Sequence, residues 1–466
     1  MYTFRMHHAR FTFRPSALDI YNSVITFTYA VDLEDGKRIE YRDILEFPGT
    51  TPGMWRRIPA PLLSNLLEAL NVMLGIGYWK IHCAPEMHTE GFSLTPEQAE
   101  FWNAVYTKGL GEFFYKAQID FRGLISFPYD ATGRTQKYPT RFVRSRSTLL
   151  ANGGGKDSVV SAEMLKTAEI PFDLFVLGRT TKMQARVASV MGKQIISIVR
   201  RIDPSVMDLS KPGKIGGGYS VVSTFTFAAV LVAALQNYRY IILSNEQSAD
   251  IPNVQYLGLD VNHQWSKSSE AEMLMRDYIA RFITPDIIPF SLLRQFSEIE
   301  MVRRFAPHSG YFHAFSSCNM NFFLPRSITD NTRPDRAYWC RKCPKCIFIF
   351  ACLTAFLPKE VVVDIFGANV YADATLLPTY KELLGLEGFK PFECVGTSEE
   401  MIVAMRRAQE TGSYKGEPAM DLFEKSVAFD DRSSKEMEQR VFSAHGTGTM
   451  PEEFASFFGT DVSLTR

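Results

Sequence analysis

A glycine-rich loop is the first feature of this chain whose residue types can do chemistry. It runs from Asn152 to Ser158 as N-G-G-G-K-D-S, between a short apolar run and a pattern typical of a helix. Glycines allow a sharp turn with consecutive N–H groups exposed, and the positive end of the following helix points into the loop. A phosphate chain is the predicted ligand. Lys156 would add positive charge, and Asp157 would help to hold a magnesium ion.

Two common phosphate-binding motifs do not fit this loop. A Walker A loop would need glycine at Leu150 and a hydroxyl at Asp157. A dinucleotide fingerprint that begins at Gly153 would need glycine at Ser158. An ordinary glycine turn in an α/β sheet is the plain alternative. A second glycine run, at residues 216–218, is either another anion site or a simple connection.

Four cysteines form a second candidate site. Cys340, Cys343 and Cys346 have C-x2-C-x2-C spacing, and Cys318 lies upstream. Thiolates at such spacing can converge on one tetrahedral zinc ion, and basic neighbours favour their deprotonated form. A site closed by four cysteines would be structural, because no position is left for water. An iron–sulfur cluster and free thiols at the start of an apolar helix are the alternatives.

Polar side chains that follow apolar segments add further candidates. Asn245 and Glu246 come directly after a predicted strand, where ligands bind in parallel sheets. His263 and Lys267 share one later segment, and histidine titrates near neutral pH. Cys394 is a third candidate for proton transfer. Three basic residues either hold a substrate diphosphate or form a solvated face: Arg141, Arg144 and Arg146.

The elements that must position these residues follow an α/β pattern. Strands predicted at 147–152, 172–177, 194–200 and 238–244 alternate with helices that begin at Asp157 and cover 182–191 and 221–235. Such alternation implies a parallel sheet with helices on both faces. Ligands in sheets of this kind bind beyond the carboxyl ends of the strands, which is where the glycine loop and Glu246 fall.

Four regions are predicted along the chain. Residues 1–140 form an N-terminal α+β module of unknown role, with antiparallel strands to about residue 60, a turn at 34–36 and a helical pattern from 61 to about 118. Residues 141–290 form the nucleotide-binding domain. Residues 291–410, helical in part, hold the cysteine cluster and the substrate region. Residues 411–466 are a polar segment that we expect to pack loosely.

Composition restricts the class of protein. The chain has 466 residues, of which 46% are hydrophobic, and its 51 basic residues equal its 51 acidic ones. This balance gives no general electrostatic reason to bind nucleic acid or an anionic membrane. The most apolar stretches, 225–235 and 346–357, are shorter than the ~20 residues of a membrane helix. We therefore expect a cytoplasmic protein with a small-molecule substrate, and the oligomeric state stays undetermined.

The glycine loop resembles the PP-loop of the ATP pyrophosphatase superfamily, which is written S-G-G-x-D-S. Gly154, Gly155, Asp157 and Ser158 match it, and Gly153 replaces the usual serine, which removes one hydroxyl from the phosphate contacts. The resemblance implies cleavage of ATP between its α and β phosphates and transfer of AMP to a substrate oxygen. The cysteine cluster is similar to that of the cyano-deazaguanine synthases, where the fourth cysteine lies closer upstream than Cys318 does here.

Three more segments narrow the resemblance: S-N-E-Q-S at 244–248, V-N-H-Q-W-S-K-S at 261–268 and F-E-C-V-G-T at 392–397. Together with the loop and the cysteine cluster, they resemble the UDP-N-acetyl-alpha-D-muramoyl-L-alanyl-L-glutamate epimerases of bacterial peptidoglycan synthesis. The resemblance implies ATP-dependent inversion of the terminal L-glutamate of UDP-MurNAc-L-Ala-L-Glu through an acyl-adenylate, with release of AMP and pyrophosphate. Adenylation cancels the carboxylate charge, so a side-chain base can remove the neighbouring proton.

These observations give one set of site hypotheses. ATP and magnesium are expected at loop and strand-end residues: Gly153, Gly154, Gly155, Lys156, Asp157, Ser158, Asn245 and Glu246. The catalytic candidates are Lys156, Asp157, His263, Lys267 and Cys394, and the proton-transfer residue stays open among the last three. Two other classes of function compete: another adenylating enzyme that forms amides or modifies nucleobases, and a non-catalytic nucleotide-binding protein.

Overall fold

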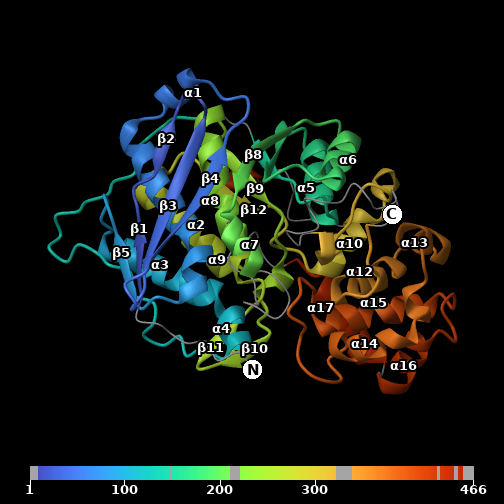
Figure 1. The fold of residues 1–466 in the computed structure, drawn as a ribbon. Coiled ribbons are helices and arrows are strands. Elements are labelled where there is room, and N and C mark those ends of the chain that lie inside the picture. The colour runs from blue at the N-terminus through green and yellow to red at the C-terminus, as the bar shows by residue number, and fades with distance from the viewer. Residues whose placement is uncertain are drawn as a thin grey trace.

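Ten strands share one mixed sheet in the computed structural model, which describes residues 9–145, 148–209, 221–321, 338–427, 431–444 and 450–454 (Figure 1). The strand order is β12-β9-β6-β7-β8-β4-β3-β1-β5, and β2 pairs with β3. The first five strands are parallel, as the alternation of strands and helices predicts. Their bounds are Ile288–Ser291 (β12), Tyr240–Leu243 (β9), Thr148–Ala151 (β6), Phe172–Leu177 (β7) and Ile195–Arg201 (β8).

The N-terminal strands extend the same sheet. They are β1 (Arg10–Phe13), β2 (Ala17–Asp19), β3 (Val24–Asp32), β4 (Arg38–Glu46) and β5 (Glu86–Thr89). The predicted antiparallel strands and turn are confirmed, because β3 pairs antiparallel with β4 and Gly36 N–H donates to Leu33 O at 3.0 Å. The helical prediction for 61–118 is wrong at β5, which pairs parallel with β1. Only the tertiary partner β1 makes this short segment a strand.

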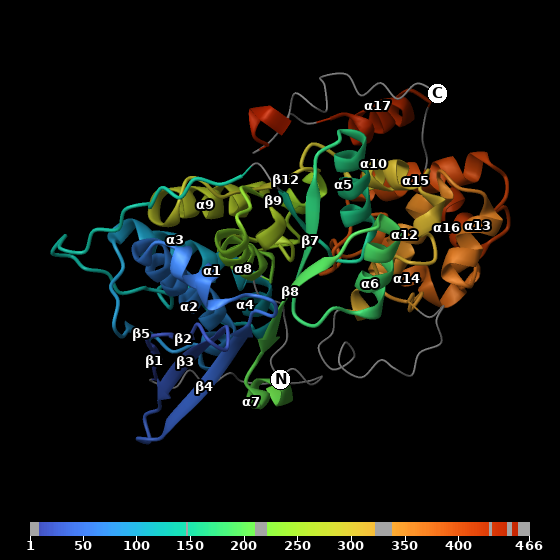
Figure 2. The same ribbon diagram turned by 90° about the horizontal axis from the view of Figure 1, so that it is seen from above.

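Helices cover both faces of the parallel strands, as predicted (Figure 2). On one face, Leu149, Phe175 and Ile241 belong to a core shared with α1 (Pro52–Arg57), α2 (Ala60–His82), α3 (Pro96–Gly109), α4 (Gly111–Ala117), α8 (Val221–Gln236) and α9 (Ser269–Tyr278). The adjacent strand residues Leu150, Leu174 and Ile242 belong to the opposite core with α5 (Lys156–Thr167), α6 (Lys182–Met191), α10 (Glu298–Phe305) and α12 (Pro344–Thr354). This period of two is the expected side-chain alternation of a strand.

Local sequence signals explain the well-predicted elements. The strand at 172–177 and the helix at 182–191 have the predicted bounds. Thr181 and Gln184 form a capping box at the start of α6, and Gly192 ends it with φ +69°. The remaining short elements are α7 (Pro204–Leu209), β10 (Val254–Tyr256), β11 (Leu259–Val261), η1 (Gln247–Asp250), η2 (Trp265–Lys267), η3 (Ile279–Ile283), η4 (Ser309–Tyr311) and η5 (Asn319–Asn321).

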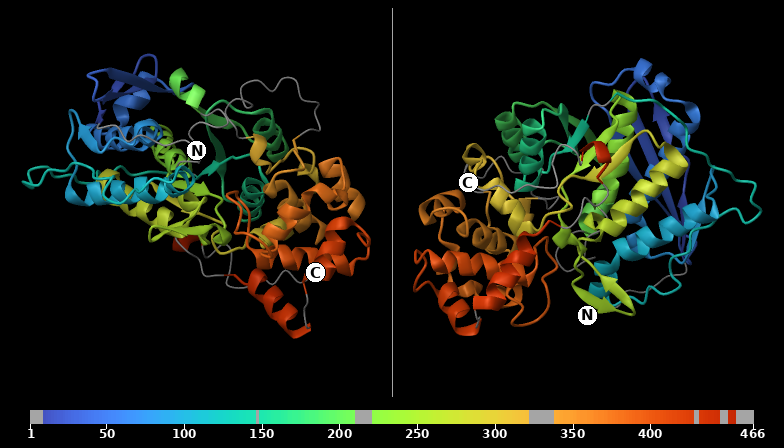
Figure 3. Two further views of the ribbon diagram at one scale, coloured as in Figure 1. Left: turned by 60° about the horizontal axis from the view of Figure 1, so that its bottom comes forward. Right: turned by 180° about the vertical axis from the view of Figure 1, so that it is seen from behind.

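A helical layer follows the cysteine cluster and packs against α10 and α12 (Figure 3). It contains α13 (Lys359–Phe366), η6 (Val370–Ala372), η7 (Ala374–Leu376), α14 (Leu377–Leu383), α15 (Ser398–Glu410), α16 (Pro418–Ser426) and α17 (Asp431–Phe442). The expectation of loose packing after residue 411 is wrong for α16, since Ala419, Met420 and Phe423 are buried. These apolar residues recur three or four positions apart, so a mostly polar composition still presents one apolar helix face.

Helix α2 is the one described helix with the length and composition of a membrane span. More than half of its most apolar window is buried inside the protein, against α8 and the N-terminal strands. A helix that is mostly buried in the core of a protein passes the same compositional test.

A buried ion pair joins the N-terminal strands to the parallel ones. Strand β4 pairs antiparallel with β8 through Ile44, Leu45 and Glu46. Beside this ladder, Arg200 donates to Asp43 at 2.6 Å (Nη2 to Oδ2), and Asp43 is fully buried. Tyr78 of α2 also donates to Asp43 Oδ2, at 3.1 Å. The joint is therefore held by a carboxylate that water cannot reach.

Removing this carboxylate should loosen the joint. In Asp43→Asn, Arg200 stays buried without its charge partner, so we expect the free energy of unfolding in urea to fall by about 3–5 kcal/mol. Arg201→Gln is the matched control, because Arg201 pairs with Glu46 on the same two strands but is 60% exposed. Its loss should cost less than about 1 kcal/mol. Equal effects of the two variants would contradict this account of the joint.

Candidate functional site

The glycine loop connects β6 to α5, as predicted. Gly154 has φ +74°, and a Cβ at this position would lie 2.9 Å from Met183 Cε, so only glycine fits. The loop is fixed from inside, since Asn152 Oδ1 accepts a hydrogen bond from Gly154 N–H at 3.0 Å. A Cβ at Gly153 would meet nothing within 4 Å. Space for a ligand therefore lies on the Gly153 side of the turn.

A segment just before the cysteine cluster packs on this loop. Ser316 N–H donates to Gly154 O at 3.2 Å, and a Cβ at Gly155 would lie 3.3 Å from Ser317 Oγ. Among the described residues, the buried Ser317 hydroxyl has no hydrogen-bond partner. A buried hydroxyl of this kind normally finds a partner, so its position beside Gly155 fits a bound polar group.

Three charged side chains meet behind the loop, where α5, α10 and α12 lie side by side (Figures 1 and 2). Lys156 is fully buried, with Nζ 2.9 Å from Glu298 Oε1 and a second contact to Asp157. Lys345 of α12 also pairs with Glu298. Burial works against the charges of Lys156 and Glu298, yet the two lysines lower the pKa of Glu298 and the acidic groups raise that of Lys156. Lys156 and Glu298 are therefore both charged at neutral pH.

Two predicted site residues, Asn245 and Glu246, follow strand β9. Glu246 is buried, and burial together with repulsion from Glu298 raises its pKa to about 7. Asn245 Nδ2 donates to Ser291 Oγ at 3.0 Å, so this predicted site residue ties β9 to the end of β12. The buried Arg294 donates to the carbonyls of Glu246 and Lys267, at 2.9 and 2.6 Å. It fixes the two predicted segments to each other.

The three candidates for proton transfer lie together, although 131 positions separate His263 from Cys394 in the sequence. Burial opposes the charge of each group. Lys267 first, and then His263, lower the pKa of Cys394 to about 6. Contacts with Cys394 and Glu112 raise the pKa of His263 to about 10, and Cys394 is the leading cause that raises the pKa of Lys267.

Four charged residues of this site were not predicted from the sequence: Glu112, Glu298, Lys345 and Glu393. Glu112 Oε2 lies 2.6 Å from His263 Nδ1, and Asn319 donates to Glu393, whose pKa burial raises to about 7. Glu298 is the first residue of α10, seven residues after the end of β12, which was itself not predicted. Glu393 lies in the segment at 392–397 but was assigned no role, and Glu112 stands in no motif, so only the tertiary structure reveals its part in the site.

The four predicted cysteines converge. Their sulfur atoms all lie within 4.8 Å of one another, with Cys318 to Cys343 at 4.0 Å and Cys340 to Cys346 at 3.7 Å. The backbone N–H of Cys343 points at Cys340 Sγ, at 3.3 Å, as expected beside a metal-bound thiolate. This set of soft donors fits one tetrahedral metal ion such as zinc. Cys318 thus supplies the fourth sulfur of the cluster.

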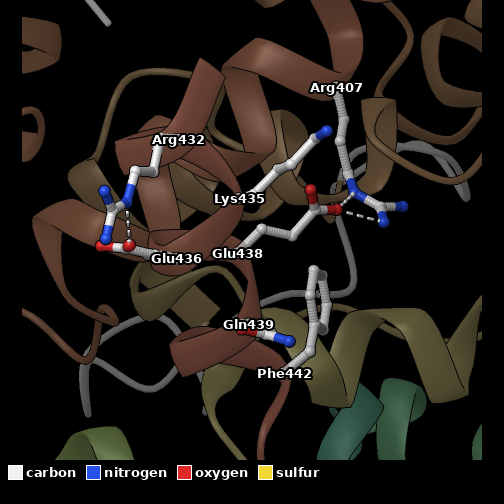
Figure 4. Close-up of a pocket in the computed structure, with 7 residues that line it drawn as sticks. All are labelled: Arg407, Arg432, Lys435, Glu436, Glu438, Gln439 and Phe442. Atoms are coloured by element: carbon white, nitrogen blue, oxygen red, sulfur yellow. Dashed lines mark hydrogen bonds and ion pairs between the residues drawn. The ribbon is translucent and has the colours of Figure 1, made fainter. Parts of the chain in front are cut away.

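Other sequence candidates lie elsewhere. Arg141 pairs with Asp286 at 3.1 Å, and the Arg144 guanidinium lies over the Phe142 ring. Arg146 and the glycines at 216–218 lie outside the described residues. A hollow of about 840 Å³ between α15 and α17 is lined by none of the predicted residues (Figure 4). The residues that line this hollow are Arg407, Arg432, Lys435, Glu436, Glu438, Gln439 and Phe442.

Comparison with known proteins gives one family. Residues 3–292 match a model described as the MurL N-terminal domain, and residues 314–438 match the MurL C-terminal domain. Three relatives are named UDP-N-acetyl-alpha-D-muramoyl-L-alanyl-L-glutamate epimerase. That of Salinispora tropica is 34% identical over 98% of this chain and 97% of its own length, and that of a Micromonospora species is 33% identical over 96% of each.

The third relative, from Xanthomonas oryzae pv. oryzae, is 34% identical over 90% of this chain and 89% of its own length. No solved structure matched the chain. The comparisons confirm the resemblance that rests on the glycine loop, the cysteine cluster and the three shorter segments. The chain therefore belongs to the MurL family, the UDP-N-acetyl-alpha-D-muramoyl-L-alanyl-L-glutamate epimerases.

Proposed function

We propose that this chain converts the terminal L-glutamate of UDP-MurNAc-L-Ala-L-Glu to D-glutamate and consumes ATP through an acyl-adenylate, with AMP and pyrophosphate as products. One observation carries the proposal. The Lys267 ammonium interacts electrostatically with Cys394 on one side and with Asp157, Glu246 and Glu298 beside the glycine loop on the other. A phosphate-binding loop and a proton-accepting thiol thus belong to one buried network, as adenylation followed by inversion requires.

The reaction explains why ATP is needed. Removing a proton next to an ionised carboxylate would place a second negative charge beside the first. Adenylation of that carboxylate cancels its charge, so the developing carbanion is stabilised as an enolate and the barrier falls. The acylated nitrogen of the substrate cannot form a Schiff base, which rules out activation through pyridoxal phosphate and favours activation at the carboxylate.

The nucleotide side of the site uses the predicted loop. The N–H groups of residues 153–155 and the N-terminus of α5 bind the phosphates that leave as pyrophosphate. Lys156, held charged by Glu298, stabilises negative charge at the scissile phosphate. Asp157, Glu246 and Glu298 offer carboxylate oxygens, the ligands that magnesium prefers, and Glu298 Oε2 has no hydrogen-bond partner among the described residues. When bound, magnesium neutralises charge on the phosphates.

The pKa values favour one of the three candidates for the base. At neutral pH His263 and Lys267 carry protons, whereas Cys394 has a pKa of about 6 and is a thiolate. A protonated group cannot accept a proton, so we assign Cys394 as the base. Lys267, which is charged and in contact with the same network, is the donor to the opposite face of the carbanion.

The cysteine cluster serves the site as a clamp that binds zinc. Cys318 follows directly on the segment that contacts Gly154 and Gly155, and Cys343 caps the helix that carries Lys345. A zinc ion at the four sulfurs would hold both segments against the glycine loop. The substrates are small molecules, and we place the reaction in the cytoplasm, where ATP and nucleotide-linked precursors occur and free thiols persist.

The whole proposal is tested with UDP-MurNAc-L-Ala-L-Glu, ATP and magnesium in heavy water. We expect pyrophosphate together with D-glutamate that carries deuterium at Cα, and neither product without ATP. In Cys394→Ser the inversion and the deuterium exchange should fall at least about 100-fold, because a hydroxyl is a far weaker base. Pyrophosphate release without inversion by the unaltered chain would leave an adenylating enzyme of another kind and refute the epimerase.

The glycine loop gives a second prediction. Gly154→Ala forces a side chain into the left-handed region, which costs about 1–2 kcal/mol, and also against Met183. We expect substrate-dependent pyrophosphate release to fall about 5- to 30-fold or more. Gly153→Ala is the matched control, since its Cβ meets nothing within 4 Å of protein, and it should retain a folded loop. The loop geometry is refuted if Gly154→Ala is the milder of the two variants.

Zinc analysis gives a third prediction. Elemental analysis should find about one zinc ion per chain, bound by four thiolates. Cys340→Ser should lose the zinc, lower the thermal midpoint and abolish pyrophosphate release, because the segment at residues 316–318 would no longer be held on the loop. Cys83→Ala removes a buried cysteine outside the cluster and should keep the metal. Full activity of zinc-free protein would refute the role as a clamp.

A further inference from the structure

Glu112 connects the N-terminal half of the chain to the reaction site. It is the second residue of α4, and its side chain is almost fully buried. Its Oε2 lies 2.6 Å from His263 Nδ1, and its Oε1 accepts from Lys116 Nζ at 2.5 Å. Both oxygens are therefore engaged, and the carboxylate holds one orientation toward the imidazole.

The imidazole in turn reaches Cys394. With Nδ1 turned to Glu112, His263 is in hydrogen-bond contact with the Cys394 thiol. Asn253 fixes the spacing of the two segments, because His263 N–H donates to its Oδ1 at 2.8 Å and its Nδ2 donates to Pro391 O at 2.8 Å. The carboxylate thus contacts the imidazole, and the imidazole interacts with the thiol, the order of contacts that holds a histidine–cysteine pair as imidazolium and thiolate.

We propose that Glu112 is a positioning residue for inversion: it orients the His263 ring and keeps it protonated, so that Cys394 stands ready as a thiolate. This inference rests on the proposed function, in which Cys394 removes the α-proton. It also gives the N-terminal α+β region a part in the chemistry, since α4 supplies the carboxylate through the same core that joins α4 to the parallel strands.

The charge states of Glu112, His263 and Cys394 agree with this arrangement. Burial opposes ionisation of Glu112, but His263 and then Lys116 lower its pKa to about 2, so it is a carboxylate at any working pH. The pKa of His263 is raised to about 10 and that of Cys394 is lowered to about 6. The other charged groups that face the three residues are Lys80, Lys116, Lys267, Lys345, Lys390 and Glu393.

Protons balance over one turnover. The Cys394 thiolate takes the Cα proton and becomes a thiol, while the electron pair of the broken C–H bond enters the enolate of the adenylated glutamate. Lys267 gives one proton to the opposite face of Cα and becomes neutral. Return of the thiol proton to solvent and uptake of one proton by Lys267 restore the starting state. Glu112 stays deprotonated and His263 stays protonated throughout. Their role is to keep Cys394 a thiolate at the start of each turnover.

Glu112→Gln tests the proposal in the full-length, metal-loaded protein. The rate at which iodoacetamide alkylates Cys394, followed by peptide mass spectrometry across pH, reports the thiolate. In the wild type the midpoint should lie near pH 6. Without the Glu112 charge, His263 loses its proton more readily, and we expect the midpoint to rise by about one pH unit or more, toward the ordinary cysteine value. The acidic limb of the kcat/KM profile for inversion should move by the same amount.

At pH 5, below both midpoints, a shift of one unit would slow inversion about tenfold, and at pH 7 about twofold, with recovery as the pH rises. Glu112→Asp, which keeps the charge but is shorter, should fall between the wild type and Glu112→Gln. Glu270→Gln is the matched control: Glu270 also bridges the two halves, through Lys108 of α3 and Trp265 of η2, without touching His263. It should leave the alkylation midpoint in place.

An unshifted alkylation midpoint in Glu112→Gln overturns the proposal, and so does a shifted midpoint that leaves the inversion profile unmoved. Alkylation needs no substrate, so failure of the wild type to invert glutamate counts against the proposed function alone. If Glu112→Gln does not fold by circular dichroism, NMR titration of His263 in the wild type decides. The ring should stay protonated to about pH 10, and titration near the ordinary value of about 6.5 overturns the proposal.

Discussion

The site depends on the burial of Lys156. A fully buried ammonium is stable only when carboxylates surround it, and the nearest are Asp157 on its own helix and Glu298 on α10. Glu298 in turn brings in Lys345 from α12. Buried ion pairs of this kind add little net stability, because desolvation cancels most of the attraction. Their value here is that they fix the charge and place of each group beside the phosphate loop.

Two larger features make this network possible. The cysteine cluster brings the start of α12 and the segment before Cys318 together, so the helix with Lys345 and the serines that contact the loop meet at one place. The continuous sheet does the same from the other side. Because β4 pairs with β8, the N-terminal helices share a core with the parallel strands, and Glu112 reaches His263. A thiol far along the sequence thereby meets a protonated imidazole.

Much of the nucleotide half was predictable, since its signals are local. The strand at 172–177 and the helix at 182–191 have the predicted bounds, because apolar periodicity and a capping box act within a few residues. Strands β5 and β12 were not predicted. Each is only four residues long and is a strand because of its partner, β1 or β9. Tertiary packing also explains why α16 is not loosely packed, because neighbouring helices bury its apolar residues.

The sequence by itself determined the family, the glycine loop as the candidate phosphate site, the four clustered cysteines and the three candidates for proton transfer. Each of these is a run of residue types whose spacing carries the chemistry. Only the tertiary structure decided their states. Whether Cys394 is a thiolate and His263 an imidazolium depends on the fields of Lys267 and Glu112, which come from other elements. Coulomb interactions act through space over a few ångströms in a dry interior, so charge states follow from packing and not from order along the chain.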